Sequence, residues 1–157
     1  MNWNRALLAL ACIISLLAGN FGAKAEMPDI IPLPVKLELQ PGTFVLAQTA
    51  KIVVSPGAEE TGRYLAAELG RRVSIHPDIL TATHPRGGGD IELTVQTANF
   101  PLGEEGYTLV VKPGGVIIKA GGPTGLFYGV QSFLQLLPVA AESDRTPTNR
   151  LIPCVTV

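Results

Sequence analysis

Cysteine is scarce in this chain of 157 residues, which contains only Cys12 and Cys154. Cys12 lies in an N-terminal stretch that we expect to be removed, so the remaining protein cannot form an internal disulfide. Charged residues are also few, at 16%, and the two signs are mixed to a net charge of −1. A weak and balanced charge gives no basis for binding nucleic acid or an anionic membrane. We therefore expect packing to supply the stability.

A long apolar run lies near the N-terminus, where residues 6–19 read ALLALACIISLLAG. The run is too short to span a bilayer comfortably, and Ala23-Lys24-Ala25 follows it as a small-x-small cleavage site. This pattern predicts a signal peptide over residues 1–25 and export to the periplasm or the extracellular space after cleavage near Ala25. A retained membrane anchor and a lipoprotein cleavage before Cys12 are the alternatives.

The next part of the chain carries the period-2 alternation of short strands, interrupted by glycine and proline. Proline-rich residues 27–34 are expected to be extended, and Pro41-Gly42 is expected to end the strand that follows. A surface loop is expected over residues 76–89. Pro113-Gly114-Gly115 predicts a hairpin turn. The expected strands are residues 35–39, 43–47, 51–55, 90–96, 107–112 and 116–120.

Two segments carry the periodicity of amphipathic helices. The first runs from Pro56-Gly57 to about Arg71 and places Glu68 on the face that we expect to contact water. The second is GLFYGVQSFLQLLP, residues 125–138, in which a close backbone approach would explain Gly129. Gln131 and Gln135 are expected to make polar contacts at the edge of the packing or with a further domain. The order of the elements predicts an α+β fold: a mostly antiparallel sheet with two helices packed on one face.

The acidic and histidine residues do not form the pattern of a catalytic or metal site. His76 and His84 lie among prolines in the expected loop and are interpreted as solvated. Glu59-Glu60 is interpreted as complementing the dipole at the start of a helix. Glu104-Glu105 precedes a strand, and adjacent residues on a strand point to opposite faces. None of these pairs is therefore expected to converge on one reacting atom.

The remaining candidates are also interpreted as structural. Cys154 has no identifiable base partner, and the glycine-rich stretch from Gly121 to Gly125 lacks the lysine and the spacing of a phosphate loop. The single tryptophan lies in the expected signal peptide, which leaves Tyr64, Tyr107 and Tyr128 as candidates for a sugar-binding surface. We therefore predict no catalytic, cofactor-binding or metal-ligating residue, and we expect no cofactor.

Three stretches together have the pattern of one known domain. They are IIPLPVKLELQPGTFVL (residues 30–46), EEGYTLVVKPGGVIIKAGGPTGLFYGVQSFLQLLP (residues 104–138) and LIPCVTV (residues 151–157). The first two resemble the start and the end of the N-terminal domain of glycoside hydrolase family 20, the β-N-acetylhexosaminidases. The third resembles the short bridge from that domain into the catalytic domain.

The resemblance implies that residues 26–138 form a non-catalytic accessory domain and that residues 139–157 are a linker and the start of a bridge into a catalytic (β/α)₈ barrel. In the family, an Asp-Glu pair of the barrel protonates the glycosidic oxygen and positions the acetamido group of the substrate, which attacks as the nucleophile. This chain contains no Asp-Glu dipeptide, so no catalytic residue is transferred to it.

The resulting hypothesis is an N-terminal fragment of an exported β-N-acetylhexosaminidase, whose absent barrel would hydrolyse terminal N-acetylhexosamine residues by substrate-assisted retaining catalysis. The chain alone is predicted to be inactive. Its expected partner is the barrel of the same polypeptide, with no nucleic acid and no stable membrane anchor. The alternative hypothesis is an independent carbohydrate- or protein-binding module without hydrolase activity.

Overall fold

The computed structural model describes residues 27–81, 88–138 and 150–157. The expected signal peptide, His84 and most of the expected linker lie outside these residues. The described helices and strands follow one another in the order β1 (Glu38–Val45), β2 (Ile52–Val54), α2 (Glu59–Val73), β3 (Ile79–Thr81), β4 (Asp90–Val95), β5 (Tyr107–Lys112), β6 (Gly115–Ala120), α3 (Pro123–Gln135) and β7 (Leu151–Thr156).

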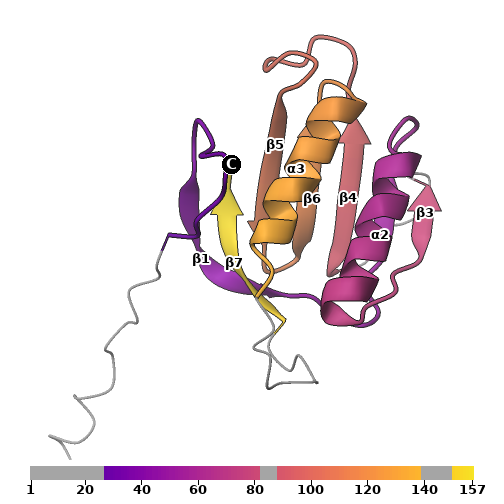
Figure 1. The fold of residues 1–157 in the computed structure, drawn as a ribbon, viewed down its shortest axis with the longest axis vertical. Coiled ribbons are helices and arrows are strands. Elements are labelled where there is room, and N and C mark those ends of the chain that lie inside the picture. The colour runs from indigo at the N-terminus through magenta and orange to yellow at the C-terminus, as the bar shows by residue number, and fades with distance from the viewer. Residues whose placement is uncertain (1–26, 82–87, 139–149) are drawn as a thin grey trace, which may run out of the picture.

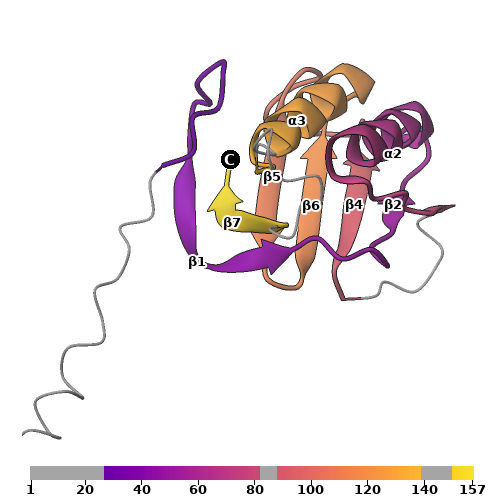
Figure 2. The ribbon, with the colours of Figure 1, turned by 60° about the horizontal axis from the view of Figure 1, so that its bottom comes forward.

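These strands form one seven-stranded sheet in the order β1-β7-β5-β6-β4-β2-β3, and both helices cover the same face (Figures 1 and 2). Strands β1, β7, β5 and β6 pair with one another in antiparallel fashion. The predicted α+β fold, with antiparallel pairing and two helices on one face, is confirmed. The sequence did not predict the other half of the sheet, in which β6, β4, β2 and β3 pair in parallel. It arises in part because α2 returns the chain between β2 and β3, so both strands run in one direction.

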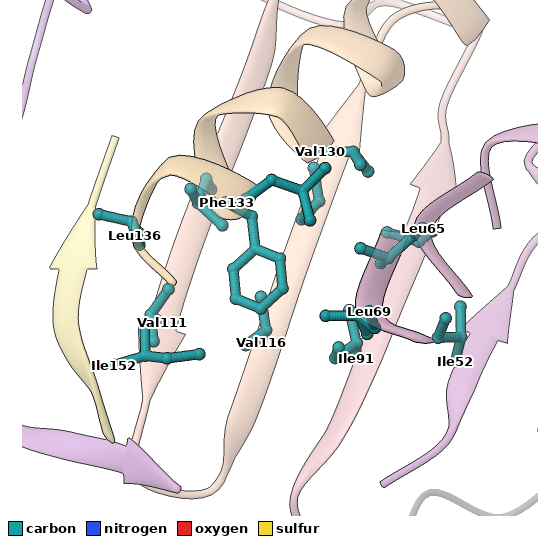
Figure 3. Close-up of a cluster of buried hydrophobic side chains, with 14 of the residues drawn as sticks. Ile52, Leu65, Leu69, Ile91, Val111, Val116, Val130, Phe133, Leu136 and Ile152 are labelled. Carbon is teal, nitrogen blue, oxygen red and sulfur yellow. The ribbon is translucent and has the colours of Figure 1, made fainter. Parts of the chain in front are cut away.

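The hydrophobic core lies between the sheet and the two helices (Figure 3). Phe133 of α3 points toward the sheet near Val116 and is fully buried. Burying a side chain of this size stabilises the fold by roughly 1.5–3 kcal/mol. The other fully buried core side chains that the figure labels are Ile52, Leu65, Leu69, Ile91, Val111, Val130 and Ile152.

Helix α3 packs closely on the β5–β6 hairpin at Gly129. A methyl group added to Gly129 would lie 2.5 Å from Cγ2 of Ile118 and 3.1 Å from Cδ2 of Tyr107. The close approach suggested by this glycine is therefore confirmed. The Tyr107 hydroxyl also shares a 2.6 Å hydrogen bond with Oγ of Ser132, which joins β5 to the same helix.

Two strands differ from the sequence prediction. Pro41-Gly42 does not end a strand, because β1 continues through it with a register change against β7 between Leu39 and Thr43. Such a bulge accommodates proline because the residues within it are released from the ladder. The expected loop over residues 76–89 contains β3, which pairs with β2 at the edge of the sheet.

The position of Glu68 on α2 differs from the sequence prediction, which placed this residue on the face in contact with water. It is only 7% exposed rather than directed to water. Its carboxylate accepts hydrogen bonds from Arg71 and, at 2.9 Å, from Nε of Arg72. Both arginines follow within one helical turn, where such pairs form readily. Their hydrogen bonds hold the pKa of Glu68 below its ordinary value of 4.5.

Truncation of Phe133 is expected to weaken the core strongly. Phe133→Ala removes a fully buried ring and should lower the free energy of unfolding by about 3–5 kcal/mol, measured by urea denaturation. Phe127→Ala is the matched control, because this ring lies on the same helix and is 39% exposed. A midpoint left unchanged by Phe133→Ala would contradict the assignment of this face to the core.

Gly129→Ala is expected to destabilise the protein although alanine is the better helix former. The gain in propensity is about 1 kcal/mol, and overpacking against the buried methyl of Ile118 costs about 1–3 kcal/mol. Thr124→Ala, at an exposed position of α3, should leave stability unchanged or slightly raised. A Gly129→Ala protein with a higher thermal midpoint than the original would contradict the close approach.

The ion pairs of Glu68 predict a pH-dependent contribution to stability. Because the pKa is lower in the folded chain than in the unfolded chain, the contribution is present above about pH 4.5 and is lost as pH falls through the folded-state pKa. Glu68→Gln should therefore be less stable than the original protein at pH 7, and the difference should shrink below pH 4.5. A difference in unfolding free energy that stayed constant from pH 7 to pH 3 would contradict this role.

Candidate functional site

The histidine and acidic residues do not assemble a metal centre in the described part of the chain. Within residues 27–81, 88–138 and 150–157, no three His, Cys, Asp or Glu side chains come together as a metal ion would require. His76 is exposed, and its ring packs over Gly70 of α2. His84 lies outside the described residues, so its interpretation as a solvated side chain stays a prediction.

The paired glutamates lie at the ends of secondary-structure elements. Glu59 and Glu60 occupy the first turn of α2, and the Glu59 carboxylate accepts a 2.9 Å hydrogen bond from the N–H of Gly57. Both contribute negative charge where the helix dipole favours it. Glu104 and Glu105 are exposed in the bend before β5 and have no strand positions of their own.

The glycine-rich stretch between β6 and α3 is a tight strand-to-helix turn, as the sequence predicts. A methyl group on Gly125 would lie 2.6 Å from the carbonyl oxygen of Gly106 and 2.8 Å from that of Glu105. The glycines therefore let the turn pack backbone against backbone on the segment before β5. This arrangement directs carbonyl oxygens at the turn, whereas a phosphate loop surrounds its anion with N–H groups.

Cys154 lies on β7, inside the sheet, and is only 1% exposed. Burial raises the pKa of its thiol. The thiolate is the reactive form of cysteine, so this environment disfavours nucleophilic chemistry. We assign Cys154 a packing role.

The sheet face opposite the helices holds an open groove of about 530 Å³. Its carboxylates already accept hydrogen bonds within the sheet: Asp90 from the N–H of Lys51 at 3.2 Å, and Glu92 from the hydroxyl of Thr94 at 3.2 Å. Both carboxylates therefore make contacts within the domain. Its lining residues are Val53, Asp90, Glu92, Val110, Lys112, Pro113, Gly114, Gly115, Val116 and Ile117.

A small aromatic cluster lies on α2 and α3. The ring of Phe127 packs on Tyr64 at 5.1 Å with a 51° tilt and on Tyr128 at 6.4 Å with a 61° tilt. Gln131 donates a 2.9 Å hydrogen bond to the Tyr64 hydroxyl. The three rings are therefore not coplanar. The sequence suggested Tyr64 and Tyr128 as candidates for a sugar-binding surface, but not Phe127.

Gln135 connects the end of α3 to the N-terminal segment. Its side-chain oxygen accepts a 2.8 Å hydrogen bond from the N–H of Ile31, and its amide donates a 3.0 Å hydrogen bond to the carbonyl of the same residue. Gln131 and Gln135 thus make the polar contacts at the edge of the packing that the sequence predicts. Their amides are engaged within the domain and do not form a separate site.

The groups that could carry chemistry therefore make structural contacts within the described residues. They do not converge on a position for a reacting atom. No helix among these residues combines the length and the apolar character that a membrane crossing requires. The function is therefore better sought in the fold as a whole and in the surfaces that it presents.

Comparison with known proteins identifies the fold. Residues 27–157 match the sequence model described as "Glycosyl hydrolase family 20, domain 2". A β-hexosaminidase of Porphyromonas gingivalis is 36% identical over 145 residues, which make up 86% of this chain and 18% of that enzyme. A lacto-N-biosidase of Bifidobacterium bifidum is 31% identical over 97 residues, covering 61% of this chain and 8% of that enzyme.

Solved structures agree with this result. The family 20 β-N-acetylhexosaminidase of Streptomyces coelicolor A3(2) superposes with a TM-score of 0.70 and 32% identity, over 83% of this chain and 26% of that one. The N-acetyl-β-hexosaminidase of Streptomyces plicatus gives a TM-score of 0.69 and 33% identity, over 83% of this chain and 25% of that one. The chain thus spans about a quarter or less of the length of these relatives. It belongs to glycoside hydrolase family 20 and comprises the N-terminal, non-catalytic domain of that family.

Proposed function

We propose that this chain is the N-terminal accessory domain of an exported β-N-acetylhexosaminidase and that it supports a catalytic barrel which continues from Val157. The observation that carries the proposal is the match over residues 27–157 to a domain that lies alongside a catalytic barrel in the same polypeptide. The interpretation of residues 1–25 as a signal peptide supports export, although these residues lie outside the described structure.

The chemistry of the whole enzyme is assigned to the barrel. We propose that it hydrolyses terminal N-acetylhexosamine residues by substrate-assisted retaining catalysis, in which the acetamido group of the substrate is the nucleophile. The assignment is supported by the contacts of the described residues: Cys154 is buried, and Asp90 and Glu92 accept hydrogen bonds within the sheet. The domain would contribute by positioning and stabilising the barrel.

The alternative of an independent carbohydrate-binding module receives no support from the geometry. The candidate rings are partly covered by one another, because Phe127 packs on Tyr64 at 5.1 Å and on Tyr128 at 6.4 Å. The hydroxyl of Tyr64 is already bound to Gln131. The accessory role is therefore the function that we retain.

The proposal predicts that hydrolase activity requires the barrel and is absent from this chain alone. The purified chain should not hydrolyse 4-nitrophenyl N-acetyl-β-glucosaminide, whereas the polypeptide extended in frame beyond Val157 into a barrel should release nitrophenol. The measurement is the absorbance of nitrophenol at equal molar concentrations of the two proteins. Turnover by the chain alone, in material free of other glycosidases, would overturn the assignment of catalysis to the barrel. An extended polypeptide without a barrel, or without activity, would overturn the accessory role.

A further inference from the structure

We draw no further inference here: the strongest candidate, the exposed apolar surface patch of Ile31, Leu33 and Val35 in the extended segment before β1, carries none because nothing in the structure shows what covers it.

Discussion

The arrangement of the domain depends on its last strand, β7, which lies inside the sheet between β1 and β5. It pairs with β1 over the length of that strand, and Val157 exchanges two backbone hydrogen bonds with Leu109 of β5. Without β7, β1 would have no neighbour in the sheet. Because β1 follows directly on residues 27–37, the strand that closes the fold also fixes this segment and Val157 relative to each other.

Helix α3 provides the second constraint, and it explains why so many polar groups are unavailable for chemistry. Its inner side places Phe133 in the core, and a methyl group added to Gly129 would lie only 2.5 Å from Cγ2 of Ile118. Its glutamines bind the hydroxyl of Tyr64 and the backbone of Ile31. A segment that resembles part of an enzyme therefore serves to hold together the sheet, α2 and the backbone at Ile31. This supports an accessory role, in which the domain offers a rigid surface to the part of the enzyme that acts.

Much of the fold follows from local sequence patterns. The hairpin of β5 and β6 is predictable because Pro113-Gly114-Gly115 interrupts clear alternation, and α3 because its apolar residues follow a helical period. The parallel pairing of β2 with β4 is not predictable in this way, since it joins segments far apart in the chain. The burial of Glu68 is also not predictable from the sequence. A charged residue is expected to be exposed unless the positions of its two arginine partners are known. Residues 27–34 illustrate the same limit, because their prolines predict an extended backbone but not the hydrogen bonds between Ile31 and Gln135.

The central claim is that the chain forms one rigid domain closed by β7, from which a connected barrel would be positioned. Residue-resolved amide hydrogen exchange on the intact chain tests it most directly. The account predicts that the amides of β7 and of Val157 exchange as slowly as those of Leu109 on β5 and Ile118 on β6, because all of them open only when the domain unfolds. Exchange in β7 that is orders of magnitude faster than in β5 and β6 would contradict it, since the last strand would then be separable from the domain.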